Sequence, residues 1–143
     1  VWRGFRPRRG PAGKAGGGRM NGRQRGDGAR GGQLLAIKSN APHLYPDGRY
    51  PGMIDRAAEN AYSFPYLLDE GQRVAQAYGA TCTFHVFVLD RERHLRYQGR
   101  FDDSRLVAKV TSHDLRKALD DVLAGRGVRV STTRPFGCSL DFV

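Results

Sequence analysis

Two cysteines are the residues of this chain best suited to covalent chemistry. Cys82 and Cys138 are the only thiols among its 143 residues. A thiolate can attack a peroxide or a disulfide, and a second thiol can then resolve the product. One interpretation therefore makes them redox-active thiols, and the competing one makes them packed or free structural cysteines. Their spacing does not decide whether they form a disulfide, so both states stay open.

Histidines near these thiols raise the question of a metal site. Cys82 and His85 have the spacing C-x-x-H, and Cys138 and His94 are the further ligands that a zinc site would need. Zinc usually takes four convergent ligands at motif spacing, and no second close pair is present here. The sequence therefore predicts no metal site.

The remaining charged residues do not form a recognisable catalytic motif. Asp102-Asp103 is not expected to act as an acid–base pair, because neighbours on an extended chain point to opposite sides. Arg100 and Arg105 flank the pair, so we expect a solvated loop of salt-bridged charges. His43 and His113 have no visible partner. No glycine-rich phosphate loop or nucleophile elbow occurs, and the sequence indicates no cofactor.

The elements that must position these residues alternate between strands and helices. Apolar runs and alternation predict strands at 34–38, 64–68, 84–89 and 94–101, with a hairpin loop at 90–93 between the last two. Helices are predicted at 52–61, 70–78 and 112–124. Asp69 is expected to cap the second helix with Gln72 as its capping-box partner, and Gly79 to end it. This order predicts an α/β fold.

Charge is concentrated in the first 33 residues. They hold nine basic residues and one acidic residue, a net +8 of the chain's +10, together with eleven glycines. Such a segment cannot bury enough apolar surface to offset its conformational entropy, so residues 1–33 are predicted to be a disordered tail. The preferred interpretation is a solvated tail or sequence foreign to the domain. The alternative is an arm that binds nucleic acid or another polyanion.

Composition also bears on the compartment. No stretch approaches the roughly 20 apolar residues that cross a bilayer, and two cysteines do not make a secreted disulfide framework. The N-terminal segment is charged but lacks the apolar core of a secretory signal. We therefore expect a cytoplasmic protein without a membrane partner.

Several runs of the sequence resemble one known family. They are LLAIKSN followed by YPD, FPYLLDE, VAQAYGATCT, VFVLD, YQGRFDDSR and FGCSLDF, which extend over about residues 31–142. Together they resemble the peroxiredoxin-like branch of the thioredoxin superfamily, the redoxin or AhpC/TSA-like proteins. The resemblance implies a thioredoxin-like fold at residues 34–143, thiol oxidoreductase or antioxidant activity, and a thiol-redox protein as partner.

Two departures from the family pattern bear on activity. The family has a strand–CxxC–helix unit before LLAIKSN, which supplies the nucleophilic thiol and a central strand, whereas residues 1–33 contain no cysteine. We therefore expect a truncated domain with an incomplete sheet and impaired or absent catalysis. The family's Thr-Pro, with its cis proline, is Thr83-Phe84 here. A cis bond before Phe84 would cost about 3–4 kcal/mol, so a trans bond and a remodelled loop are expected.

By the same resemblance, the loop before residues 84–89 lies beside the family's active site. This makes Cys82 the candidate catalytic thiol, with Cys138 as a second thiol. Thr81, Thr83 and Phe84 would form the substrate-groove loop. The alternative function is a non-enzymatic thioredoxin-fold binding module with a basic arm for polyanions, and a third interpretation is a fragment with no function of its own.

Overall fold

Among the residues that the structure describes, five short strands form one mixed sheet. The computed structural model describes residues 2–3, 11–40 and 50–142. In chain order the strands are β1 (Trp2–Arg3), β2 (Ala36–Lys38), β3 (Tyr66–Leu68), β4 (Val86–Leu89) and β5 (Leu95–Gly99). The order in the sheet is β3-β2-β1-β4-β5, in which β1 and β3 run parallel to β2, and β4 runs antiparallel to both β1 and β5. The predicted α/β class and hairpin are therefore confirmed.

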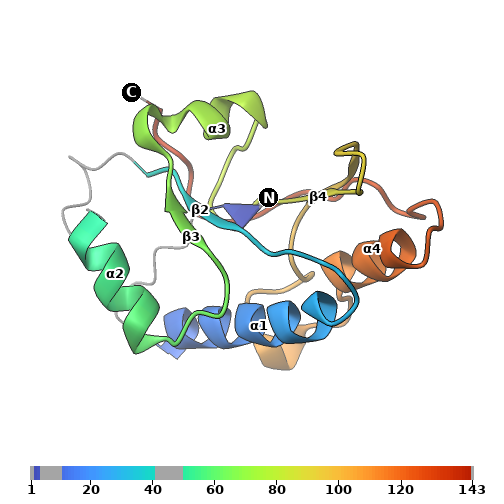
Figure 1. Ribbon diagram of the computed structural model, residues 1–143, viewed down its shortest axis with the longest axis horizontal. Coiled ribbons are helices and arrows are strands. Elements are labelled where there is room, and N and C mark those ends of the chain that lie inside the picture. Colours follow the sequence, from blue (N-terminus) through green and yellow to red (C-terminus); the bar gives the residue numbers. More distant parts are fainter. Residues whose placement is uncertain (1, 4–10, 41–49, 143) are drawn as a thin grey trace.

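The helices flank this sheet. They are α1 (Pro11–Gly28), α2 (Tyr50–Glu59), α3 (Arg73–Ala77) and α4 (Asp114–Leu123), with short 3₁₀ turns η2 (Glu70–Gln72) and η3 (Val107–Lys109). Figure 1 shows α1 (blue) and α4 (orange) on one side of the sheet, α3 (green) on the other, and α2 beside β3. No helix among the described residues is both long enough and apolar enough to cross a bilayer.

β4 separates two apolar clusters. Val86 and Val88 belong to the cluster that contains Leu115 of α4 and Met20 of α1. Phe87, which lies between them, belongs to the second cluster, with Ala80 and Leu140 among its other members. Because successive side chains of a strand point to opposite faces, the fully apolar run of β4 requires cover on both sides.

The prediction for residues 1–33 is wrong over the part that is described. The backbone of β1 pairs with β2 and β4 in the middle of the sheet, and residues 11–28 are helical. The segment is thus not a disordered tail there, and the sheet does not lack a central strand. Residues 1 and 4–10 lie outside the described part, as do residues 41–49, which hold most of a predicted loop and His43.

The reason is a set of buried contacts that composition does not reveal. Met20 is 2% exposed, within the main apolar cluster. The side-chain amide of Asn21 donates to the carbonyl oxygens of Asn60 and Ala61, at 3.0 Å each. Its oxygen accepts from the backbone N–H of Ser63 at 2.9 Å and from the hydroxyl of the same residue at 3.2 Å. These contacts compensate for the glycines of α1, which disfavour a helix.

The start of α3 is capped as the sequence predicts, although by a different arrangement. Asp69 accepts from the backbone N–H groups of Val74 at 3.0 Å and Ala75 at 2.9 Å. Gln72 is not its reciprocal partner, because its side-chain amide donates to the Ser39 carbonyl at 2.8 Å. The capping-box prediction is therefore wrong, and Gln72 instead ties the helix start to the end of β2.

Replacement of Asn21 by Ala should destabilise the protein by about 1–2 kcal/mol, because the partly buried backbone groups of the 60–63 turn would lose the hydrogen bonds that the Asn21 side chain supplies. Urea unfolding followed by circular dichroism measures this change. Arg25→Ala is the matched control, since Arg25 lies exposed on the same helix. Equal stability of the two variants would contradict the docking of α1 described above.

Candidate functional site

The Cys82 loop joins α3 to β4 and is covered by the C-terminal segment. Gly79 ends α3 with a φ of +61°, in the position that the sequence predicts. Cys82 is 8% exposed and forms an isolated antiparallel bridge with Ser139. The backbone N–H of Thr83 donates to the Cys138 carbonyl at 2.8 Å. The structure therefore brings the two cysteine-bearing segments together, with Cys82 buried and Cys138 exposed.

The residues predicted to form a substrate groove are largely closed off. Thr83 is 4% exposed, and its hydroxyl accepts from the backbone N–H of Cys138 at 2.9 Å. A Cβ added to Gly137 would lie 2.0 Å from the carbonyl oxygen of Thr83, so only glycine fits there. Thr81 is exposed and Phe84 is half-buried. Residues 137 and 138 thus cover Thr83.

Phe84 carries the remodelled backbone of this loop. No cis peptide bond occurs among the described residues, which confirms the trans geometry predicted before Phe84. Phe84 has a φ of +62°, in the left-handed region that non-glycine residues rarely adopt. The loop therefore makes a sharp backbone turn at Phe84.

The surroundings of Cys82 disfavour its thiolate. Burial is the largest effect and raises the pKa of Cys82, and nearby Cys138 acts in the same direction. A hydrogen bond with Thr81 and the positive charge of Arg105 act in the opposite direction but do not cancel it. Since the thiolate is the nucleophile, a raised pKa reduces the nucleophilic fraction of Cys82.

The four residues considered for zinc do not converge. Within the described residues, no three of Cys82, His85, His94 and Cys138 bring their ligand atoms together. His85 instead stacks on Phe87, with ring centroids 4.4 Å apart.

A different group at the β4–β5 hairpin has the geometry of a weak cation site. The ligand atoms of Asp90, Glu92 and His94 lie within 4.8 Å of one another. Asp90 also accepts from the guanidinium of Arg96 at 2.6 Å, so the positive charge of that arginine already lies beside the carboxylate. We therefore interpret these three residues as ordinary charged residues of a hairpin loop.

The acidic pair has different partners from those predicted. The buried carboxylate of Asp102 lies 2.7 Å from Nδ1 of His113, a histidine for which the sequence offered no partner. Asp103 pairs with the hydroxyl of Thr111. Arg100 donates from Nε to a carboxylate of α4 at 2.6 Å, and its positive charge helps to lower the pKa of Asp103. Asp102 and Asp103 thus serve separate contacts.

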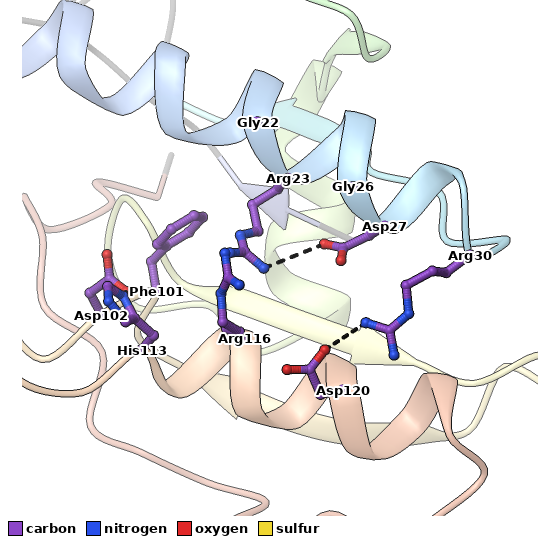
Figure 2. A pocket seen from close by; sticks show the side chains of 10 residues that line it. All are labelled: Gly22, Arg23, Gly26, Asp27, Arg30, Phe101, Asp102, His113, Arg116 and Asp120. Atoms are coloured by element: carbon purple, nitrogen blue, oxygen red, sulfur yellow. Dashed lines mark hydrogen bonds and ion pairs between the residues drawn. The ribbon is translucent and has the colours of Figure 1, made fainter.

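A cavity of about 480 Å³ lies between α1 and α4. Figure 2 shows its charged lining, with one wall on α1 and the other on α4 and the segment before it. The lining residues are Gly22, Arg23, Gly26, Asp27, Arg30, Phe101, Asp102, His113, Arg116 and Asp120. This cavity could not be predicted from the sequence, because one of its walls lies in the segment predicted to be disordered.

Comparison with known proteins finds similar solved structures, and the names of these proteins state no activity. No protein-family model and no curated protein matches the chain. A crystal structure of an uncharacterized conserved protein from Geobacillus kaustophilus is similar, with 36% identity, a TM-score of 0.82, and coverage of 89% of this chain and 68% of the other. A hypothetical protein from Sinorhizobium meliloti 1021 is similar at 36% identity and a TM-score of 0.81, with 89% and 70% covered.

Alkylation should distinguish the two thiols. Cys138 should react with iodoacetamide like an exposed thiol, and Cys82 at least about tenfold more slowly, because burial blocks the reagent and lowers the thiolate fraction. Peptide mass spectrometry measures both rates, and Cys138→Ser isolates the slow one. Urea should remove the difference, whereas equal rates in the folded protein would contradict the burial of Cys82.

Replacement of Thr111 by Val should destabilise the protein in a pH-dependent way. The Thr111 hydroxyl is the largest cause that lowers the pKa of Asp103 from 3.8 to about 2. A carboxyl whose folded pKa is depressed adds stability above its unfolded pKa, and this stability is lost as the pH falls through the folded value. The difference in unfolding free energy between wild type and variant, here called the gap, should therefore be largest at neutral pH. It should shrink toward zero as the pH falls from about 3.8 to about 2.

Urea unfolding across this pH range measures the gap, and a carboxyl NMR titration follows Asp103 directly. Thr132→Val, at an exposed threonine, is the matched control. A gap that does not change with pH would assign the loss to packing rather than to the hydrogen bond.

Proposed function

This chain belongs to the same family as those two uncharacterized proteins. We propose that it is a thioredoxin-like, peroxiredoxin-type thiol oxidoreductase with impaired catalysis. The observation that carries the proposal is the position of Cys82, in the loop that enters β4 and directly beside the segment of Cys138. A protein with two unpaired thiols in adjacent segments has the groups that thiol–disulfide chemistry requires.

The arrangement of the sheet supports a thioredoxin-like fold. A parallel part, β2 with β3, is followed along the chain by the antiparallel hairpin β4–β5 and a final helix, α4. The short strand β1 occupies the centre, between β2 and β4. The sequence runs that resemble redoxin proteins include β2, β3, β4 and the second half of β5.

The chemistry would begin at the Cys82 thiolate. Its sulfur attacks one oxygen of a peroxide and the O–O bond breaks, which leaves a sulfenic acid and releases an alcohol or water after protonation. The thiol of Cys138 then condenses with the sulfenic acid to form a disulfide and a second water. A thiol-redox partner protein supplies two electrons and two protons to restore both thiols.

Two observations support impaired catalysis. Burial raises the pKa of Cys82, so little thiolate is present at neutral pH. The C-terminal segment also covers the approach to Thr83, at the contact with Gly137. Both effects lower the rate of the first step, which this proposal assigns to Cys82, with Cys138 as the resolving thiol.

The competing function, a binding module with a basic polyanion arm, has less support. Arg30 of the supposed arm lies 2.6 Å from Asp120 of α4, and Arg23 is only 17% exposed at its side chain. Charges that are paired or buried are poorly placed to track a phosphate backbone. A cytoplasmic location, where free thiols persist, is part of the thiol proposal.

Peroxide oxidation tests both parts of this proposal. Hydrogen peroxide should produce a sulfenic acid at Cys82, which dimedone traps. Peroxide turnover supported by dithiothreitol should exceed that of a free thiol by no more than about tenfold, because the thiolate fraction limits the rate. Cys82→Ala should remove the excess turnover. Fast turnover would overturn the impairment, and failure of excess peroxide to modify Cys82 would overturn the thiol function.

A further inference from the structure

Two arginine side chains meet in the cavity between α1 and α4 without close acceptors. Arg23 points from α1 toward α4, and Arg116 points from α4 toward α1 (Figure 2). The best partner of Arg23 is Asp27, at 3.9 Å, although the Arg23 side chain is only 17% exposed. Arg116 is exposed at the mouth of the cavity, and within residues 11–40 and 50–142 its guanidinium has no hydrogen-bond or ion-pair partner.

The other charges of the cavity are already paired. Arg30 lies 2.6 Å from Asp120, and His113 lies 2.7 Å from Asp102. The remaining carboxylate, Asp27, lies 3.9 Å from Arg23, beyond hydrogen-bond distance. Two guanidinium groups that face one space repel each other unless an anion lies between them.

We propose that this cavity binds a small phosphate-bearing molecule, with the phosphate group between the guanidinium groups of Arg23 and Arg116. A dianion matches two guanidinium charges, and the planar fork of each arginine suits two phosphate oxygens. A single carboxylate would leave one charge uncompensated. The proposal is independent of the thiol chemistry at Cys82.

The shape of the cavity favours a small molecule. Its volume of about 480 Å³ falls in the range of ligand pockets, about 300–1,000 Å³. Gly22 and Gly26 form part of the α1 wall, and a Cβ added at either would meet no atom within 4 Å. Phe101 contributes an apolar surface for the organic part of the molecule.

A titration of the full chain tests the proposal. Inorganic phosphate, phenyl phosphate and benzoate are added at constant ionic strength, and two-dimensional amide NMR spectra are recorded. Both phosphates should bind saturably, with shifts centred on Gly22–Asp27 and Arg116–Asp120. Phenyl phosphate should bind more tightly than inorganic phosphate, and benzoate more weakly than either. Tighter binding of benzoate would overturn the choice of phosphate.

Matched variants locate the site. Arg116→Gln should weaken phosphate binding by about tenfold, the loss of one charge-assisted contact. Arg134→Gln removes the same charge from an exposed position outside the cavity and should change the affinity less than twofold. Gly26→Leu adds a side chain at the open cavity wall and should abolish binding, while circular dichroism checks that the fold is kept.

Three results would overturn the proposal. The first is an absence of saturable shifts at α1 and α4. The second is equal weakening by Arg116→Gln and Arg134→Gln, which would assign the effect to net charge. The third is that single-stranded DNA displaces phosphate and binds equally well to the Gly26→Leu variant. That result would favour a diffuse polyanion surface.

Discussion

The side chain of Asn21 is the contact on which much of the structure depends. It satisfies backbone groups of the turn at 60–63, where Ala61 adopts a left-handed φ of +48°. The same side chain fixes α1, which places Met20 in the main apolar cluster and supplies one wall of the α1–α4 cavity. Because α1 is rich in glycine, this docking must come from tertiary contacts rather than from helix propensity.

Elements whose signal is local could be predicted from the sequence, and elements held by distant contacts could not. β4, β5 and their hairpin were recognisable because an apolar run and an alternation of apolar and polar residues involve only neighbouring positions in the sequence. α1 was missed because Asn21 finds its partners 39 to 42 residues away. Composition gives the entropic cost of ordering such a segment but says nothing of the buried hydrogen bonds that offset it.

The same limit applies to the thiol site. The loop before β4, with Cys82 in it, could be predicted from the sequence. The accessibility of Cys82 depends on the C-terminal segment, where the backbone N–H of Cys138 donates to the hydroxyl of Thr83, 55 residues earlier in the chain. That approach is close because position 137 is a glycine. The charged residues of the cavity had no local signature either, since Arg116 sits on α4 like any surface arginine and becomes distinctive only opposite Arg23.

The basic charge of the first 33 residues has a different meaning once it is placed in the fold. Arg30 neutralises Asp120, and Arg23 turns into a cavity, so these charges act at defined positions. The cavity and Cys82 are both connected to β4, whose Val86 and Val88 pack with α4 while Phe87 faces the cluster of Leu140, near Cys138. β4 is thus the strand against which both α4 and the C-terminal segment pack, one on each face.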